Sequence, residues 1–298
     1  MSGTIGIVGL GRVGIPAARA YIGAGYQVYG YARRSEVIKE FQALGGQHQP
    51  SPAKVARHAD TVLVLVLNDA QVIDVVTGDN GILSGATPGT NVICMSTINR
   101  FNLEAVAEQC RENKVGFVDC PFTGGPARVP DGTLTLIAAA PSRLLASVTP
   151  VLEVIGNVVH AGDEPGCGQA IKHCNQLLVA ATHAATMEVI TLARRLGLNP
   201  ALVSQVVGSG IAGSDYFRLL SESVLEKTPS PGGLGQMCKD VSIVVNTARE
   251  VKMPAHVVTA ASQYFLVAEA LGMQAREGAD LIEVVEHVSG SDVGRPTG

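Results

Sequence analysis

The chain has 298 residues, with 22 lysine and arginine side chains against 26 aspartate and glutamate side chains, and its formal net charge is −4. This balance excludes a general attraction to nucleic acid or to an anionic membrane, so we expect neither as a partner. Hydrophobic residues make up 46% of the chain and charged residues 16%, which excludes a disordered protein. The 34 glycines and the lack of tryptophan indicate many tight backbone turns and few large aromatic anchors.

Membrane insertion, secretion and metal binding have no support in the sequence. The longest apolar run, residues 62–67, is much shorter than the roughly 20 residues that span a bilayer. No basic and apolar leader precedes the first predicted strand, so we expect a cytoplasmic protein. The six cysteines have no CxxC spacing and are expected to be reduced thiols, and the seven histidines show no metal-ligand spacing. We therefore expect no metal.

The N-terminal half alternates apolar segments with helical ones. Strands are predicted at residues 5–8, 28–31, 61–67, 92–95, 116–119 and 134–138, and helices at 13–23, 36–44, 52–59, 70–76 and 102–113. Continuously apolar strands separated by helices indicate a parallel sheet that is covered on both faces. The sequence therefore predicts an α/β fold, a Rossmann-type doubly wound parallel sheet, over residues 1–163.

The C-terminal half has no strand signal. Residues 169–196 contain neither proline nor glycine and predict one helix, roughly 42 Å long at 1.5 Å per residue. Further helices are predicted at 201–208, 216–225, 237–252, 255–272 and 281–288. We therefore expect an all-α domain over residues 164–298, joined to the first by a long interdomain helix and used for substrate binding and oligomerisation.

A glycine-rich turn follows the first predicted strand and opens the first helix. Its residues are Gly9, Leu10, Gly11, Arg12, Val13 and Gly14. In this context the first glycine permits a tight turn, the second lets the backbone approach a pyrophosphate, and the third allows close helix packing. The helix N-terminus adds free N–H groups and a partial positive charge. The turn predicts a bound dinucleotide, and the alternative is a tight turn without a ligand.

The end of the second predicted strand bears on the choice of dinucleotide. An NAD site usually has an acidic residue there, whereas the 2′-phosphate of NADP favours guanidinium groups. This chain has Arg33 and Arg34, followed by a serine hydroxyl. NADP is therefore the expected cofactor. Because Glu36 follows closely, a solvated basic turn beside an NAD site is the alternative.

Three polar residues near the start of the long predicted helix are candidates for catalysis. Lys172, Asn175 and Gln176 are spaced by three and four positions, so they can share one face of the helix. A lysine can transfer a proton when its pKa is lowered, and an amide can hold a substrate hydroxyl or carboxylate. On spacing alone, solvated surface residues would be the preferred interpretation.

The motifs, taken in order, resemble the β-hydroxyacid dehydrogenase family, which includes 3-hydroxyisobutyrate dehydrogenase, tartronate semialdehyde reductase and the glyoxylate/succinic semialdehyde reductases. The resemblance covers nearly the whole chain. The matching segments are the glycine turn, Ser96-Thr97, residues 119–127, residues 132–135, residues 166–176 and Lys239-Asp240. Six motifs in the family order are much more specific than a single glycine turn.

The resemblance implies a role for each matching position. It makes Lys172 the general acid/base and places the Asn175-Gln176 pair at the substrate. It implies that Thr123 and the amides of Gly124 and Gly125 form a small nest for the substrate carboxylate, with Ser96 adding a hydroxyl contact. The cofactor would be contacted by the glycine turn, Arg33, Arg34, Leu67, Asn68, Thr97 and Lys239. Without the resemblance, Lys239 would be interpreted as a lysine on a helix surface that pairs with Asp240.

Four departures from the family pattern concern substrate choice. Thr123 replaces the usual serine, Asn99-Arg100 stands where a Ser-Pro type step is common, Arg128 replaces a small residue, and Gly232 falls where many relatives carry phenylalanine. One hypothesis is that Arg100 or Arg128 meets an extra anionic group or lines the cofactor, and that Gly232 enlarges the substrate pocket. The alternative is variation of surface loops.

The sequence thus predicts an NAD(P)-dependent oxidoreductase that interconverts a 3-hydroxy acid and its semialdehyde or ketone by hydride transfer. Its partners are expected to be a small carboxylate substrate and further copies of the chain, in a homodimer or homotetramer. An imine reductase-like enzyme is one alternative, although such enzymes commonly lack the lysine at position 172. A non-catalytic cofactor-binding interaction protein is the other.

Overall fold

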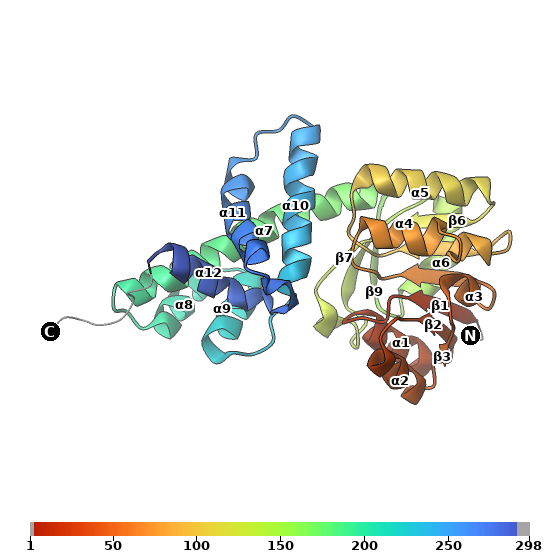
Figure 1. The fold of residues 1–298 in the computed structure, drawn as a ribbon, viewed down its shortest axis with the longest axis horizontal. Coiled ribbons are helices and arrows are strands. Elements are labelled where there is room, and N and C mark those ends of the chain that lie inside the picture. Colours follow the sequence, from red (N-terminus) through yellow and green to blue (C-terminus); the bar gives the residue numbers. More distant parts are fainter. Residues whose placement is uncertain (1–2, 291–298) are drawn as a thin grey trace. The chain divides into compact units, whose positions relative to one another are not determined.

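The computed structural model describes residues 3–290, and the chain divides into two compact units, Met1–Lys172 and His173–Gly298. Figure 1 shows the strands and their covering helices in the first unit and helices alone in the second. The expected Rossmann-type sheet followed by an all-helical region is confirmed.

The first unit is built on one nine-stranded sheet. Its strands are β1 (Thr4–Val8), β2 (Gln27–Tyr31), β3 (Gln47–His48), β4 (Thr61–Val64), β5 (Asn91–Cys94), β6 (Gly116–Asp119), β7 (Phe122–Thr123), β8 (Leu134–Ala139) and β9 (Gly156–Gly162). The order is β3-β2-β1-β4-β5-β6-β8-β7, and β9 pairs with β8. The direction of strand addition reverses between β1 and β4, and in such sheets ligands bind at the carboxyl ends beside this switch point.

Most strand pairs are parallel, as expected, and the antiparallel pairs lie at one side of the sheet. β8 runs antiparallel to both β6 and β7. The reason is local: after β6 the chain turns back through the short β7 with no crossover helix, and parallel neighbours need such a crossover. The remaining pairs, β9 on β8 included, are parallel.

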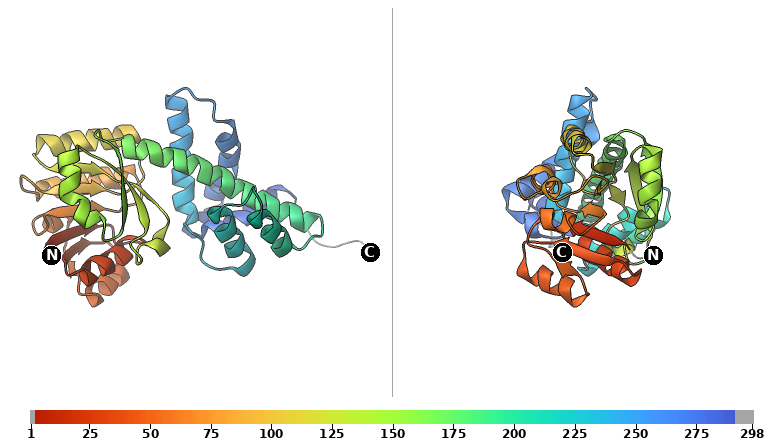
Figure 2. Two further views of the ribbon diagram at one scale, coloured as in Figure 1. Left: turned by 180° about the vertical axis from the view of Figure 1, so that it is seen from behind. Right: turned by 90° about the vertical axis from the view of Figure 1, so that its right-hand side faces the viewer.

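Helices cover both faces of the sheet, as Figure 2 shows from two further sides. These helices are α1 (Gly14–Gly23), α2 (Ser35–Ala43), α3 (Pro52–Ala56), α4 (Asp69–Thr77), α5 (Arg100–Glu112) and α6 (Ser142–Leu152). Alternate residues of the central strands enter opposite cores. In β4, Leu63 belongs to the core formed with α1, α2 and α6, whereas Val62 and Val64 belong to the core formed with α3, α4 and α5. The strands are apolar on both sides because both sides are buried.

The second unit is helical. It contains most of α7 (Cys167–Arg195) and all of α8 (Pro200–Ser209), α9 (Asp215–Glu226), α10 (Leu234–Glu250), α11 (His256–Ala270) and α12 (Leu281–Val288). Its core is formed by buried side chains of α7, α9, α10, α11 and α12, among them Met187, Leu220 and Phe265. By length and composition α7 could cross a bilayer, but half of its most apolar window is buried within the protein. That burial is what the core helix of a helical unit requires.

By the contacts within each part of the chain, the division between the two compact units falls inside α7, after Lys172. The first turns of α7 belong to the sheet unit because hydrogen bonds from Gly166 and Gln169 reach Asp119 at the end of β6. The sequence pattern shows where the last strand ends, whereas these hydrogen bonds extend the sheet unit into the first turns of α7.

Candidate active site

The glycine turn lies between β1 and α1, at the switch point of the sheet. Gly9 has a φ of +107°, and a Cβ at that position would lie 2.5 Å from the carbonyl oxygen of Leu65. A Cβ at Gly14 would lie 2.1 Å from the carbonyl oxygen of Gly9. Both positions therefore require glycine, the first for the turn and the second for close packing of the helix.

Gly11 differs from its two neighbours in the motif. A Cβ at Gly11 would meet nothing within 4 Å. Within residues 3–290 the N–H groups of Gly11 and Val13 donate no hydrogen bond, and α1 starts directly after them. Open space above unpaired N–H groups at the start of a helix suits a pyrophosphate, so the turn passes the test of fit for a dinucleotide.

Two arginines follow β2 at the same edge of the sheet. Arg34 immediately precedes α2, and its Nε lies 3.8 Å from a carboxylate oxygen of Glu36, with both side chains well exposed. Arg33 is exposed and enters no ion pair within the described chain. The charge of Arg34 is partly compensated by Glu36, whereas no carboxylate of the described chain forms an ion pair with Arg33.

The residues after the ends of β4 and β5 include two that are expected to contact the cofactor and one, Ser96, that is expected to contact the substrate. Leu67 is half exposed, and Asn68 caps α4 by accepting a hydrogen bond from the N–H of Gln71 at 3.0 Å. Ser96 is buried, and its hydroxyl donates to the carbonyl oxygen of Val66 at 2.7 Å. The proton of Ser96 is therefore used to hold two strand ends together, which leaves its oxygen as an acceptor for any substrate contact.

The predicted substrate turn lies at the end of β7. Thr123 is half-buried, and Gly124 and Gly125 have φ values of +119° and +75°. Gly125 has a ψ of 169°, which is a mirror-image extended conformation rather than the left-handed helical conformation of a regular nest. The two glycine N–H groups make no hydrogen bond with another described residue. The turn thus differs in form from the expected nest but offers the same unpaired donors.

Asp119, the last residue of β6, is fully buried and holds the start of α7. Its Oδ2 accepts hydrogen bonds from the backbone N–H groups of Gly166 at 2.9 Å and Gln169 at 3.1 Å, and its Oδ1 accepts one from Nε2 of Gln169 at 3.0 Å. Burial raises the pKa of Asp119 to about 6, against the opposing effect of these hydrogen bonds. The carboxylate satisfies N–H groups that a helix start leaves unpaired.

Gln169 connects the same helix start to a second strand end. Its Nε2 donates to the carbonyl oxygen of Ser96 at 3.1 Å, and its Oε1 accepts from the N–H of Ile98, also at 3.1 Å. Gln169 is fully buried. The sequence interpretation gave no role to Asp119 or Gln169. One signal was available in the sequence, because Asp119 is an acidic residue at the end of an apolar strand. Its partner Gln169 lies 50 residues further along the chain, so the pairing cannot be read from a local pattern.

Lys172 lies about one turn beyond Gln169 on α7 and is only 7% exposed. A buried lysine is unusual and is found where its charge is used or compensated. Its helix is fixed at its start by Asp119 and Gln169. The structure therefore places the predicted acid/base in a buried and well-supported position.

The remaining candidates form a hydrogen-bonded chain within the helical unit. Nδ2 of Asn175 donates to Oε1 of Gln176 at 2.8 Å, and Nε2 of Gln176 donates to Oδ2 of the buried Asp240 at 2.7 Å. The other oxygen of Asp240 lies 2.8 Å from Nζ of Lys239. Both ends of the Gln176 amide are thus engaged, so Gln176 orients Asn175 through this chain. The Lys239-Asp240 ion pair is present as well.

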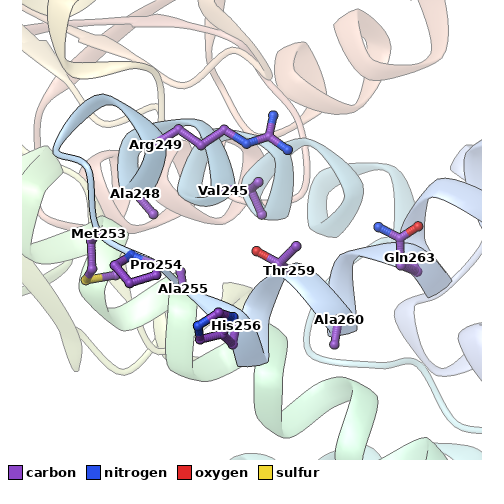
Figure 3. A pocket seen from close by; sticks show the side chains of 10 residues that line it. All are labelled: Val245, Ala248, Arg249, Met253, Pro254, Ala255, His256, Thr259, Ala260 and Gln263. Atoms are coloured by element: carbon purple, nitrogen blue, oxygen red, sulfur yellow. The ribbon is translucent and has the colours of Figure 1, made fainter.

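A separate concavity of about 430 Å³ lies in the helical unit, between the end of α10 and the start of α11 (Figure 3). Arg249, His256, Thr259 and Gln263 are among the side chains that line it. None of the residues predicted from the sequence lies in this concavity. Within residues 3–290, no group of three or more His, Cys, Asp or Glu side chains is arranged to hold a metal ion.

Comparison with known proteins agrees with both units. Residues 4–162 match the model of the NAD binding domain of 6-phosphogluconate dehydrogenase, and residues 166–288 match that of the NAD-binding domain of NADP-dependent 3-hydroxyisobutyrate dehydrogenase. The chain is 31% identical to L-threonate dehydrogenase of Cupriavidus necator, over 95% of this chain and 96% of that protein. It is 30% identical to human mitochondrial 3-hydroxyisobutyrate dehydrogenase, over 94% of this chain and 85% of that protein.

A solved structure has the same architecture. The crystal structure of 3-hydroxyisobutyrate dehydrogenase from Salmonella typhimurium superimposes with a TM-score of 0.88 at 27% identity, covering 95% of this chain and 99% of that one. Two matching domain models, relatives aligned over nearly their full length and a shared fold support one conclusion. The chain belongs to the β-hydroxyacid dehydrogenase family and is an NAD(P)-dependent oxidoreductase that acts on the CH–OH group of hydroxy acids.

Proposed function

We propose that this enzyme prefers NADP, and that it interconverts a small 3-hydroxy acid and its semialdehyde or ketone with Lys172 as general acid/base. The observation that carries the proposal is the position of Lys172. It is a buried lysine on a helix whose start is tied by Asp119 and Gln169 to the sheet that also bears the glycine turn.

The cofactor would be held by residues at the carboxyl edge of the sheet. The N–H groups of Gly11 and Val13 would bind the pyrophosphate, and Arg33, with Arg34, would bind the 2′-phosphate. Leu67, Asn68 and Thr97 would line the ribose and nicotinamide side, and Lys239 would contribute from the helical unit. When bound, the nicotinamide supplies the hydride in reduction and accepts it in oxidation.

The substrate carboxylate would be bound by the unpaired N–H groups of Gly124 and Gly125, with the Thr123 hydroxyl beside them. Fixing the carboxylate also fixes the distance from it to the reacting carbon, and such positioning lowers the entropic part of the barrier. In reduction Lys172 donates a proton to the oxygen on which negative charge develops. In oxidation it takes the hydroxyl proton instead.

Asn175 would hold the reacting oxygen through its side-chain amide. The hydrogen bond to Gln176, and from Gln176 to Asp240, fixes the rotamer of Asn175 without using its carbonyl oxygen. A preoriented amide loses less freedom when substrate binds. This assignment separates Asn175, which would touch the substrate, from Gln176, which would position Asn175.

The proposal is tested by assaying 3-hydroxy acids and semialdehydes with NAD(H) and NADP(H), for the wild type and Lys172→Ala. We expect turnover of at least one substrate, faster with NADP(H), and loss of turnover in the variant by a factor of about 10²–10⁴. Calorimetry should show cofactor affinity within about twofold of wild type, because Lys172 is assigned to proton transfer. Wild-type turnover in Lys172→Ala would refute the mechanism, and absence of turnover with every substrate would refute the proposed function.

We also propose a cytoplasmic homodimer or homotetramer. Support comes from large apolar side chains that are more than half exposed in the helical unit, among them Leu178 and Leu192 on α7 and Leu202 and Val206 on α8. Exposed apolar area of this kind is typical of surfaces that associate. Sedimentation equilibrium of the full chain gives the mass directly, and a monomer at micromolar concentration would contradict the proposal.

A further inference from the structure

Two arginines near the substrate-side motifs depart from the family pattern, and the structure separates them. Arg100 begins α5 and forms an ion pair with Glu104 one turn further along that helix. The hydrogen bond to this carboxylate raises the pKa of Arg100. Because its charge is already compensated by Glu104, Arg100 is poorly suited to bind a second anion.

Arg128 lies instead against the turn that is expected to hold the substrate carboxylate. A Cβ at Gly124 would lie 2.8 Å from Cδ and 3.7 Å from Cβ of Arg128, so the stem of the arginine covers one side of that glycine. Nε, the first atom of the guanidinium group, is bonded to Cδ, so the base of this group lies beside the Gly124 turn.

The backbone around Arg128 is fixed while its side chain remains in solvent. The N–H of Arg128 donates to the carbonyl oxygen of Gly125 at 3.2 Å, and its own carbonyl oxygen accepts from the N–H of Thr133 at 3.1 Å. The next residue, Val129, is fully buried and anchors the turn. The ion pairs found within residues 3–290 do not include Arg128, and its side chain is exposed.

We propose that Arg128 binds a second carboxylate of the substrate, so that the enzyme favours dicarboxylic over monocarboxylic 3-hydroxy acids. The proposal rests on the proposed function, since it takes the Gly124-Gly125 turn to hold the first carboxylate. Two carboxylates on a short hydroxy acid lie a few carbon atoms apart. A guanidinium beside the first site can then engage the second with two parallel hydrogen bonds.

The test compares a dicarboxylate with a partner of equal size that lacks the second charge. We would measure kcat/KM for 3-hydroxyglutarate and its monoamide with the full-length wild type, Arg128→Gln and the control Arg57→Gln. Arg57 is an exposed arginine after α3 and lines a hollow at the opposite edge of the sheet. Glutarate and glutaramate lack the hydroxyl group and cannot be oxidised. Calorimetric titration with them, in the presence of the cofactor, therefore gives the binding affinity separately from turnover.

We expect wild type to prefer the dicarboxylate by about 10- to 100-fold, and Arg128→Gln to lose this preference while monoamide turnover stays within about twofold. Arg57→Gln should retain the preference, and the isotherms should show the same pattern. An equal loss for both substrates would mean that Arg128 acts on the first carboxylate, which both substrates carry, or on the fold, and would overturn the proposal. An unchanged preference in Arg128→Gln would also overturn it. Turnover of monocarboxylic 3-hydroxy acids without turnover of 3-hydroxyglutarate would overturn it as well. Failure of the proposed function would look different, as no turnover of any 3-hydroxy acid or semialdehyde by wild type.

Discussion

The carboxylate of Asp119, at the end of β6, and the side-chain amide of Gln169, in the first turn of α7, are joined by a 3.0 Å hydrogen bond between two fully buried residues. The same carboxylate accepts the backbone N–H groups of Gly166 and Gln169. One acidic side chain therefore both caps the helix and ties it to the sheet. Because Lys172 lies about one turn further along, its position depends on this link.

Asp119→Asn should change how stability depends on pH. Burial raises the pKa of Asp119 from 3.8 to about 6. Between these values the folded protein keeps a proton that the unfolded chain has lost, so the free energy of unfolding falls as the pH rises through this range. Asparagine does not titrate. Wild type should therefore lose up to about 3 kcal/mol of stability relative to the variant between about pH 4 and pH 6, and no more above it.

Urea unfolding of both proteins from about pH 4 to pH 7.5 measures this difference. The exposed carboxylate of Asp131 lies in the same unit, and Asp131→Asn is the matched control. The control should follow the wild-type curve over the whole range. A difference between wild type and Asp119→Asn that stays constant with pH would show that Asp119 titrates near its ordinary value when folded, contrary to the expectation.

Gln169→Leu should weaken both the fold and the reaction. Leucine has a similar volume but leaves the Ser96 carbonyl, the Ile98 N–H and one oxygen of Asp119 without the hydrogen bonds that Gln169 makes. Each buried group that loses its partner costs about 1–3 kcal/mol. We expect a lower Tm and a fall in kcat with little change in KM, because the proton donor shifts while the Gly124-Gly125 turn does not. A fall in Tm with wild-type kcat at a permissive temperature would restrict Gln169 to a structural role.

Much of the fold is predictable from local patterns because burial on two faces makes a strand apolar throughout. β4 and β5 follow this rule, and α7 follows from the lack of proline and glycine. The missed elements break a local rule. β3 has only two residues, β9 is largely exposed or half-buried, and α6 contains Pro150. Their formation depends on tertiary neighbours rather than on their own residues.

The candidate site is predictable only where one short segment carries the chemistry. The glycine turn and the Lys172 stretch are short segments of this kind, and the sequence predicts them. It does not predict three contacts of the site: the Asp119-Gln169 link, the Gln176-Asp240 hydrogen bond and the contact of Arg128 with Gly124. The first two join residues that are 50 and 64 positions apart. The third depends on the positive φ of Gly124, which folds the chain back on itself. The two long-range contacts become visible only when the elements that carry them are in place.

Alanine substitutions at Gly11 and Gly14 should separate cofactor binding from folding. The Cβ of Gly14→Ala would lie 2.1 Å from the carbonyl oxygen of Gly9, so the backbone must move, at a cost of about 3 kcal/mol. At Gly11 the same atom meets open space, and the backbone there does not have a positive φ. Gly11→Ala should therefore keep the wild-type Tm without cofactor and lose the increase in Tm that cofactor produces. Retention of that increase would show that the pyrophosphate does not approach Gly11.

Arg33→Ala should lower the affinity for NADP about 10- to 100-fold and leave the affinity for NAD within about twofold, because only NADP carries the 2′-phosphate. Arg33 enters no ion pair within residues 3–290, whereas Arg34 shares its charge with Glu36 at 3.8 Å. Arg34→Ala should therefore cost less than Arg33→Ala. Calorimetric titration of wild type and both variants with each cofactor gives the four affinity ratios. Unchanged NADP affinity in Arg33→Ala would contradict the assignment. Equal losses for both cofactors would place Arg33 at the shared part of the dinucleotide instead.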